Sequence, residues 1–452
     1  MKKVTTYQNK NVIVLGIARS GIAAAKVLHQ LGAHVLMNDL NTIDESTVQP
    51  LIDMGIEVVM GSHPVERVDD SIDYLFKSPG IPYENVMVSA ALERHIPVLT
   101  DIELAYEISE APIVGITGSN GKTTTTMMIG DLLNAVQPHH AELAGNIGIP
   151  SCEVAKKMTS DQVMVMELSS FQLMGTQQFH PHIAVIVNIY EAHLDYHHTR
   201  EAYIQAKWNI QRNMTADDYL VINFNKEEWR TLAQQTKATV IPFATGQKLA
   251  KGAYEYEGRL YYNGEYVMDS SELGVPGSHN VENALAAIAV AAINGIPFGD
   301  IRRVLMHFTG AKHRLQYIGE FHQIKYYNDS KATNILATQK ALSGFDNSHL
   351  VLIAGGLDRG NSFDSLVPDL KGIKGIVLLG ETKYKLEKAA KEAGIQDIRL
   401  VDDMDQAVKE AMLIAKPGDS ILLSPANASW DQYKTFEQRG DHFMKAVHQQ
   451  NQ

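Results

Sequence analysis

The sequence predicts an α/β protein in which three domains each carry their own sheet. Short β-branched runs alternate with helical runs, a pattern typical of parallel sheets covered by helices. The length of 452 residues exceeds what one ordinary core holds. Glycine-rich or polar turns follow strands in each third. We therefore expect a Rossmann-like unit over 1–100, a central parallel sheet of the P-loop ATPase type over 101–311, and a Rossmann-like unit over 312–452.

Composition and charge exclude several functional classes. The chain is 45% hydrophobic and 20% charged, as globular proteins are. A net charge of −12 argues against a nucleic-acid-binding surface but allows a basic pocket for an anionic substrate. A single cysteine, Cys152, permits no intrachain disulfide and fits a reducing compartment. The apolar run 12–15 is too short for a signal peptide and 284–293 reads as a buried helix, so we expect a cytoplasmic protein without membrane insertion.

The first part of the chain contains a glycine turn between a strand and a helix. The expected elements here are strands over 12–15, 35–37 and 73–77 and a helix over 22–31. Gly16 to Gly21 forms the turn, and Asp39 ends the next strand, which is the layout of a dinucleotide fingerprint with an acid for ribose hydroxyls. Ala18 replaces the middle glycine and restricts approach to a pyrophosphate. By itself the turn fits either NAD or a UDP group.

The second part opens with a phosphate-binding loop. The expected elements are strands over 113–116, 163–166 and 183–189 and helices over 125–133 and 284–294. Residues 117–124, Thr-Gly-Ser-Asn-Gly-Lys-Thr-Thr, follow a strand and precede a helix, so backbone N–H groups face an anion. Lys122 supplies a positive charge and Thr123 a hydroxyl for Mg²⁺. The spacing departs from the usual motif because Ile116 stands where it has glycine, but the pattern predicts nucleotide binding.

Two further strand ends carry candidate metal ligands. Glu167 ends an apolar strand, where parallel sheets place their ligands, and a carboxylate suits Mg²⁺. The next strand leads into Asn188 to His198, a stretch rich in histidine and acid. We assign His193 to the active site and interpret His197 and His198 as ordinary loop residues. A zinc site is disfavoured because the distant paired ligands of a closed zinc site are absent.

The third part has polar clusters after three of its strands. The expected elements are strands over 324–327, 350–354, 376–379 and 421–423 and a helix from Ile335. The clusters cover 328–334, 355–360 and 424–429. Each one alone could be turn chemistry. Three at one edge of a sheet predict a crevice for a small polar ligand.

Together these loops resemble the Mur ligase family over essentially the whole chain. The loop at 117–123 is the family's own variant, shared with folylpolyglutamate synthetases, while 329–334, 424–436 and 436–440 resemble its D-glutamate-adding members. The Asp-Asn-Pro-[Arg/Lys] signature of the diamino-acid-adding members is absent. The resemblance implies an ATP-dependent, amide-bond-forming ligase of peptidoglycan synthesis. Such a ligase adds D-glutamate to UDP-N-acetylmuramoyl-L-alanine through an acyl phosphate, with neither nucleic acid nor an obligate protein partner.

The resemblance also implies the roles of individual residues. The catalytic residues would be Lys122, His193 and Lys207. ATP would be bound by Gly118, Ser119, Asn120, Gly121, Lys122, Thr123, Thr124, Asn280, Arg314 and Asp329. The UDP-linked substrate would contact Arg19, Ser20, Asp39, Asn41 and Asn146. D-Glutamate would contact Lys331, Thr333, Arg359, Ser429 and Phe436. Two Mg²⁺ sites would use Thr123, Glu167, His193 and, if carbamoylated, Lys207.

Three of these implied positions carry consequences. An unmodified Lys207 ammonium would repel Mg²⁺, whereas CO₂ addition to a neutral amine gives an anion, and burial favours the neutral amine. Arg359 stands where some members have lysine, and Leu40 where some have a hydroxyl.

Because nucleotide and glutamate would bind different domains, the third domain must close around a hinge near Ala311 and bring Asp329 to the phosphate loop.

Three other functions remain as alternatives. An NAD-dependent oxidoreductase would use the first glycine turn but leaves the loop at 117–124 unexplained. A nucleotide-dependent switch or motor would act on a protein partner and would hydrolyse nucleotide regardless of amino acids. Folylpolyglutamate synthesis is the nearest enzymatic alternative, but its members lack an N-terminal unit such as 1–100.

Overall fold

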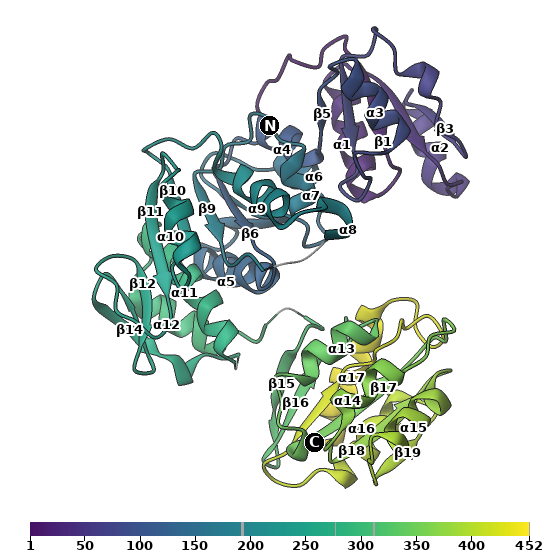
Figure 1. The fold of residues 1–452 in the computed structure, drawn as a ribbon, viewed down its shortest axis with the longest axis vertical. Helices are drawn as coiled ribbons and strands as arrows, with labels where there is room; N and C mark the ends of the chain where they lie inside the picture. Colours follow the sequence, from purple (N-terminus) through teal and green to yellow (C-terminus); the bar gives the residue numbers. More distant parts are fainter. Residues whose placement is uncertain (191–193, 276, 311, 452) are drawn as a thin grey trace. The chain divides into compact units, whose positions relative to one another are not determined.

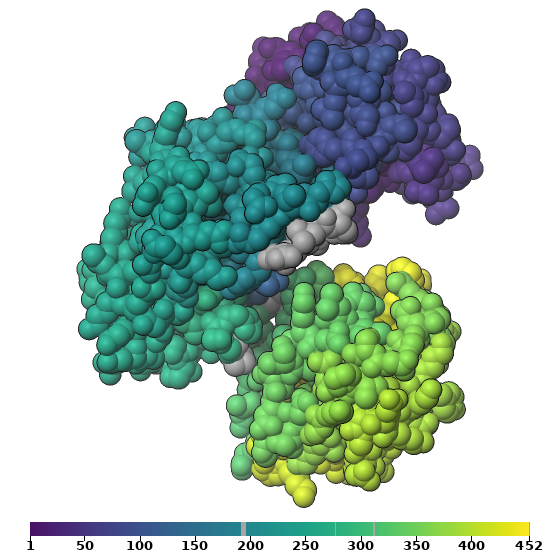
Figure 2. All heavy atoms as spheres, viewed as in Figure 1, coloured from purple at the N-terminus to yellow at the C-terminus, as the bar shows by residue number. Residues whose placement is uncertain are grey.

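The computed structural model describes residues 1–190, 194–275, 277–310 and 312–451, and it carries three separate sheets (Figure 1). The chain divides into two compact units, Met1–Leu273 with Ser278–Met306, and Gly274–Gly277 with His307–Gln452. The first unit holds two of the sheets and the second unit holds one. Figure 2 shows all heavy atoms of the chain as spheres, coloured along the sequence. The α/β class with three sheets is confirmed, while the three domain limits stay predictions and Ala311 lies outside the described residues.

The N-terminal sheet has five parallel strands in the order β3-β2-β1-β4-β5. Its strands are β1 (Asn11–Leu15), β2 (His34–Asp39), β3 (Glu57–Met60), β4 (Tyr74–Lys77) and β5 (Val98–Leu99), and its helices are α1 (Arg19–Gln30), α2 (Glu45–Asp53) and α3 (Val86–Glu93). Val12 and Val14 pack into one core and Ile13 and Leu15 into another, because both faces are covered. Chain order reverses beside β1, so its carboxyl end is the switch point where such sheets bind ligands.

The middle sheet has nine strands in the order β14-β13-β12-β11-β10-β9-β6-β8-β7, with only the β12–β13 and β13–β14 pairs antiparallel. Its strands are β6 (Ile113–Thr117), β7 (Ala141–Gly145), β8 (Val163–Glu167), β9 (Ile183–Ile186), β10 (Tyr219–Asn223), β11 (Thr239–Ala244), β12 (Ala253–Tyr256), β13 (Arg259–Tyr262) and β14 (Glu265–Asp269). The helices that accompany it are α4 (Asp101–Ile108), α5 (Lys122–Asn134), α6 (Ser151–Ala155), α7 (Ser170–Met174), α8 (Leu194–His197), α9 (Arg200–Trp208), α10 (Glu227–Ala233), α11 (Ser278–Ile293) and α12 (Phe298–His307). The central strands β6, β8 and β9 are buried along their whole length.

Several elements of the middle sheet and its helices differ from the sequence prediction. The strand expected over 183–189 ends at Ile186, because the following backbone turns to the phosphate loop: Val187 N donates to Thr117 O and Ser119 N to Asn188 O. Helix α11 begins at Ser278, six residues before the expected start at 284, since its polar first turn precedes the alanine-rich part. The strands β7 and β10 to β14 were not predicted, although β10 and β11 are mainly apolar runs.

The C-terminal sheet has six strands in the order β15-β16-β20-β17-β18-β19, with β15 antiparallel to β16 and the others parallel. Its strands are β15 (Gln316–Phe321), β16 (Ile324–Asn328), β17 (Leu350–Gly355), β18 (Gly375–Leu379), β19 (Ile398–Leu400) and β20 (Ser420–Leu423). Its helices are α13 (Ile335–Leu342), α14 (Val367–Leu370), α15 (Lys383–Glu392), α16 (Met404–Ile414) and α17 (Phe436–Gln450). The four expected strands are confirmed, and β16, β20 and β17 lie side by side.

Among the described residues, no helix is both long enough and apolar enough to cross a membrane.

Candidate functional site

The phosphate loop is held tightly between β6 and α5. Gly121 precedes α5 in a left-handed conformation (φ +79°), and a Cβ there would clash with Asn283 Oδ1 of α11. Asn188 fixes the other side of the loop: its carbonyl accepts from Ser119 N and its Oδ1 from Asn120 N, both at 2.9 Å. Glycine is therefore required at 121 by both backbone conformation and space. The loop is therefore held in a conformation in which its backbone N–H groups can bind an anion.

Two lysines meet at one carbonyl of this loop. Lys122 Nζ donates to Gly118 O at 2.8 Å and to Ser119 O at 3.0 Å. Lys207 Nζ, from α9, also donates to Gly118 O at 2.8 Å and lies 4.7 Å from the ring centre of Tyr203. Burial, reinforced by the charge of Lys122, lowers the pKa of Lys207 well below its ordinary value. The arrangement favours a neutral, nucleophilic amine at Lys207.

A buried carboxylate lies at the neighbouring strand end. Glu167 is the last residue of β8, and its Oε1 accepts from Asn146 Nδ2 at 2.8 Å. Its Oε2 is buried and has no hydrogen-bond partner among the described residues. Buried polar atoms nearly always have a hydrogen-bond or ionic partner, so this oxygen is a candidate to bind a donor or a cation. With the buried hydroxyl residue Thr123 at the start of α5, the donor set fits a hard cation such as Mg²⁺.

The histidine-rich stretch divides into three different cases. His193 lies outside the described residues, so its assigned role stays a prediction. His197 is buried, ends α8, lies 2.9 Å from Ser170 Oγ through Nε2 and stacks on Phe171. The interpretation of His197 as a loop residue was therefore wrong: the helix turns its ring into the core. His198 is exposed and pairs with Glu84 at 3.1 Å.

The N-terminal glycine turn is tied to the strand beside it by Asp39. One carboxylate oxygen accepts from Ile17 N at 2.8 Å, and the other accepts from Asn41 N at 2.9 Å. Gly16 takes φ +101°, and a Cβ there would clash with Ser78. Asp39 thus shapes the turn itself, which the sequence did not indicate. The contact of Asp39 with a ribose stays a prediction.

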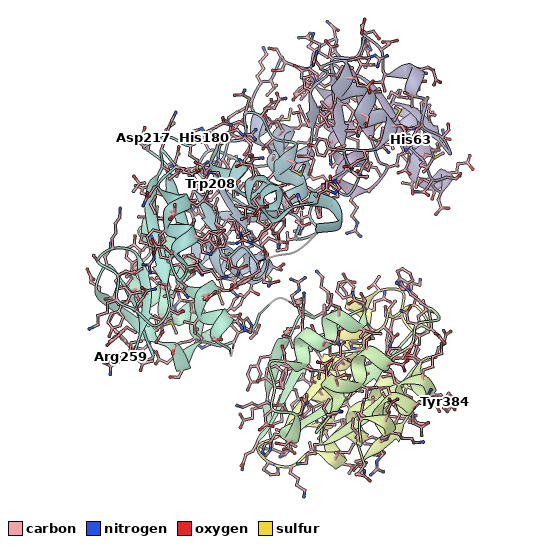
Figure 3. All side chains as sticks on the ribbon, viewed as in Figure 1. His63, His180, Trp208, Asp217, Arg259 and Tyr384 are labelled. Atoms are coloured by element: carbon pink, nitrogen blue, oxygen red, sulfur yellow. The ribbon has the colours of Figure 1, made fainter. Side chains whose placement is uncertain are left out.

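The side chain next to this turn was not anticipated from the sequence. Asn38 is buried at the end of β2 and donates through Nδ2 to Val59 O and Ser62 O. Its Oδ1 lies 2.7 Å from Nδ1 of His63, the histidine labelled in the N-terminal domain in Figure 3. His63 therefore supports the switch-point edge of the sheet from behind Asn38.

A buried lysine, Lys77, also lies at this edge and was missed. Its Nζ donates to Ile81 O at 2.9 Å and lies 3.3 Å from Tyr196 OH and 4.7 Å from the ring centre of Tyr83. Burial lowers its pKa to about 8. No local sequence signal distinguishes this lysine from an ordinary solvated strand-end residue.

In the second unit, Asp329 is the buried acid at the end of β16. Ser424 Oγ donates to its Oδ2 at 2.9 Å and Leu315 N to its Oδ1 at 3.1 Å. Burial raises its pKa to about 7 despite these bonds and the nearby positive charge of Arg314. Asp329 is thus held in place close to its titration point at neutral pH.

Arg439 joins the three polar loops of the C-terminal sheet. Its guanidinium donates to Ser330 O at 2.8 Å, to Asn427 O at 3.0 Å and to Gly355 O at 3.5 Å. It is buried on α17, and burial lowers its pKa to about 10. The structure therefore brings the three loops together at one edge, as the sequence predicted. Arg439 itself was missed, although it lies within the stretch 436–440 that carried the resemblance.

The residues predicted to bind the amino acid surround this edge. Lys331 Nζ lies 5.7 Å from the ring centre of Phe436, and Arg359 Cζ lies 4.9 Å from that of Trp430. Ser429 Oγ is buried without a hydrogen-bond partner among the described residues. Thr333 is half-buried, with its backbone N–H bonded to Lys331 O. Their ligand stays a prediction.

The predicted site residues of the first unit fall into two sets, one at the N-terminal glycine turn and one at the phosphate loop. In the first unit, the structure brings Lys122 and Lys207 to the same carbonyl and joins Asn146 to Glu167. Asn280 Oδ1 accepts from Asn283 Nδ2 at 3.1 Å, and Asn283 in turn contacts the phosphate loop. Arg19 is exposed and Ser20 half-buried at the start of α1. The approach of Asp329 to Lys122 and Lys207 stays a prediction, because Asp329 belongs to the other unit.

Family models match two regions of the chain. Residues 116–291 match the model described as Mur ligase middle domain. Residues 313–427 match the model described as Mur ligase, glutamate ligase domain.

Curated relatives match the chain along nearly its full length. A UDP-N-acetylmuramoylalanine–D-glutamate ligase from Enterococcus hirae is 58% identical over 448 residues, covering 99% of this chain and 97% of the relative. The protein of the same name from Enterococcus faecalis is 57% identical and covers 99% of both chains. The one from Streptococcus mutans is 58% identical and covers 98% of both.

Solved structures show the same fold at low sequence identity. A UDP-N-acetylmuramate–alanine ligase from Thermotoga maritima aligns with a TM-score of 0.55 at 19% identity, covering 98% of this chain and 99% of the other. A MurF ligase from Thermotoga maritima in complex with ADP aligns with a TM-score of 0.54 at 15% identity, covering 99% and 98%. These likenesses extend the fold over the whole chain.

Proposed function

This chain belongs to the Mur ligase family, and we propose that it uses ATP to join D-glutamate to UDP-N-acetylmuramoyl-L-alanine. The observation that carries the proposal is the match at 57–58% identity to D-glutamate ligases over nearly the full length of both chains. The three-sheet architecture and the phosphate loop after β6 support it. The use of ATP and a UDP-linked substrate supports a cytoplasmic location for the proposed reaction.

A carboxylate is a poor electrophile, and the proposed chemistry first converts it into a more reactive acyl phosphate. ATP transfers its γ-phosphoryl group to the substrate's terminal carboxylate, giving an acyl phosphate and ADP. The amino group of D-glutamate then attacks the acyl carbon, an amide forms, and phosphate leaves. Phosphoryl transfer depends mainly on positioning and electrostatics. Lys122, folded over the loop between Gly118 and Ser119, is placed to neutralise phosphate charge.

Thr123 and Glu167 are the described residues that would hold Mg²⁺. The buried, unbonded Oε2 of Glu167 supports that role. When bound, the cation offsets the charge that develops on the phosphate oxygens. Asn146 donates to Oε1 of Glu167 and so leaves Oε2 open for a ligand.

Lys207 is proposed to be carbamoylated. The neutral amine attacks CO₂, a bond forms between nitrogen and carbon, and loss of a proton leaves a carbamate anion. Burial and the charge of Lys122, which together lower the pKa of Lys207, support the neutral amine that this step needs. The resulting anion would also compensate Lys122, whose positive charge otherwise opposes an ammonium here.

The remaining residues are assigned according to the sheet edge at which each ligand is proposed to bind. The UDP-linked substrate is proposed to bind the first edge through Arg19, Ser20, Asp39 and Asn41. ATP is proposed to bind the loop 118–124 together with Asn280, Arg314 and Asp329. D-Glutamate is proposed to bind Lys331, Thr333, Arg359, Ser429 and Phe436. This division requires the second unit to close on the first in each turnover.

A phosphate-release assay tests the proposal. With ATP, Mg²⁺ and UDP-N-acetylmuramoyl-L-alanine, D-glutamate should stimulate release of phosphate, while L-glutamate, L-alanine and L-lysine should not. Product formation is confirmed by the mass of the new UDP-linked species. Equal phosphate release with every amino acid, or without any, would refute a D-glutamate ligase and favour a nucleotide-dependent switch.

A further inference from the structure

Trp430 is a large aromatic residue that remains 64% exposed at the carboxyl edge of the C-terminal sheet. The guanidinium of Arg359 lies over its ring, with Cζ 4.9 Å from the ring centre. This distance falls within the range of a cation–π contact. We propose that Trp430 is a positioning residue that orients Arg359 to receive a carboxylate of the incoming amino acid. The inference rests on the proposed function.

The backbone explains why these two side chains meet. Leu357 N donates to Ala428 O at 2.9 Å and joins the loop after β17 to the loop after β20. Gly356 allows this approach, because a Cβ at that position would clash with Ala428 O. Arg359 and Trp430 each lie two residues beyond the bonded pair. The contact is therefore set by the register of two loops and not by chance proximity on the surface.

The acidic neighbours of both residues face elsewhere. Asp358 pairs with Lys385 at 2.8 Å, and Asp431 accepts from the backbone N–H of Glu381 at 3.2 Å. Both carboxylates thus bind groups of the segment at the start of α15. Within the described part of the chain, no carboxylate lies within ion-pair distance of Arg359. The charge of Arg359 therefore remains available for an anionic ligand.

A flat aromatic support suits arginine in particular. A guanidinium stacks on an aromatic face and still presents its N–H fork at the edge, whereas a compact ammonium has no such plane. An exposed arginine would otherwise lose rotamer freedom on binding, and a pre-formed stack removes part of that cost. Ser429, adjacent to Trp430, adds a buried hydroxyl without a partner among the described residues. Together they form two sides of a carboxylate subsite.

Steady-state kinetics with D-glutamate test the inference. Trp430→Leu should raise the KM for D-glutamate roughly three- to fivefold, as expected for loss of an exposed cation–π contact, with kcat and the KM for ATP unchanged. Trp430→Phe, which keeps an aromatic face, should stay within about twofold of wild type. In an Arg359→Gln background, Trp430→Leu should have no further effect, because the group it orients is gone.

The matched control is Tyr256→Leu, which removes a similar contact, with Lys248 Nζ 4.6 Å from the ring centre, on strand β12 of the other unit. It should leave the KM for D-glutamate unchanged. An unchanged KM in Trp430→Leu would overturn the inference, and so would a rise that persists in the Arg359→Gln background. If the wild type shows no D-glutamate-dependent turnover, the proposed function fails and the inference fails with it.

Discussion

Lys77 at the end of β4 and Lys207 on α9 are both buried beside aromatic rings, yet their surroundings differ. Lys77 Nζ donates to Ile81 O and lies close to the hydroxyl of Tyr196. Lys207 Nζ donates to Gly118 O, a carbonyl that the ammonium of Lys122 also uses. Lys77 thus supports the segment that follows β4, and Lys207 supports the phosphate loop. Only Lys207 faces a second cation.

The nearby charge of Lys122 changes the protonation, and therefore the reactivity, of the buried amine of Lys207. Burial alone lowers the pKa of Lys77 to about 8, so this lysine stays mainly protonated at neutral pH. Burial together with the charge of Lys122 lowers the pKa of Lys207 well below its ordinary value. A charged amine stabilises a loop through its carbonyls, whereas a neutral amine can react. The comparison supports a structural role for Lys77 and the chemical role proposed for Lys207.

The largest effect is expected at Lys207. Lys207→Ala should lower kcat by roughly 10²–10³, the cost of losing one preorganised electrostatic group. Short carboxylates such as acetate should restore part of the activity by occupying the position of the carbamate. Phosphate release with and without added carboxylate measures this. Lys77→Ala, assayed in parallel, should show no such rescue. Failure of carboxylates to rescue Lys207→Ala would count against carbamoylation.

A smaller effect on stability is expected at Lys77. Lys77→Met should lower the free energy of unfolding by about 1–3 kcal/mol, because buried acceptors such as Ile81 O lose their donor. Urea unfolding followed by circular dichroism measures the change. The matched control is Lys26→Met on the exposed side of α1, where about 0.5 kcal/mol or less is expected. Equal changes in both variants would show that Lys77 does not support the loop.

The smallest effect is a dependence of stability on pH. The folded-state pKa of Lys77 is lowered to about 8 from 10.5, so its contribution is fully present above pH 10.5 and is lost as pH falls through 8. Between pH 9 and pH 7, wild type should lose about 1 kcal/mol relative to Lys77→Met. Urea unfolding of both proteins at several pH values gives the difference. A constant difference over this range would contradict the lowered pKa.

Local sequence order was sufficient to predict the loop between β6 and α5 and several strands of each sheet, but not β7 or β10 to β14. Loop 117–124 needs only a strand, a glycine turn and a helix in succession, and these are properties of neighbouring residues. The same reasoning failed for His197, which was interpreted as a loop residue and is buried against Phe171. It could not find Lys77, because its contact Tyr196 lies 119 residues away along the chain.

The sequence by itself determined which backbone shapes occur: the left-handed Gly121, the turn at Gly16, and the order of strands and helices that produces three sheets. Only the tertiary structure decided the ionisation of the buried acidic and basic groups. Asp329, with its pKa raised to about 7, and Lys207, with its pKa lowered, are ordinary residues in the sequence. Their ionisation depends on desolvation and on nearby charges supplied by distant segments, and folding alone brings those together.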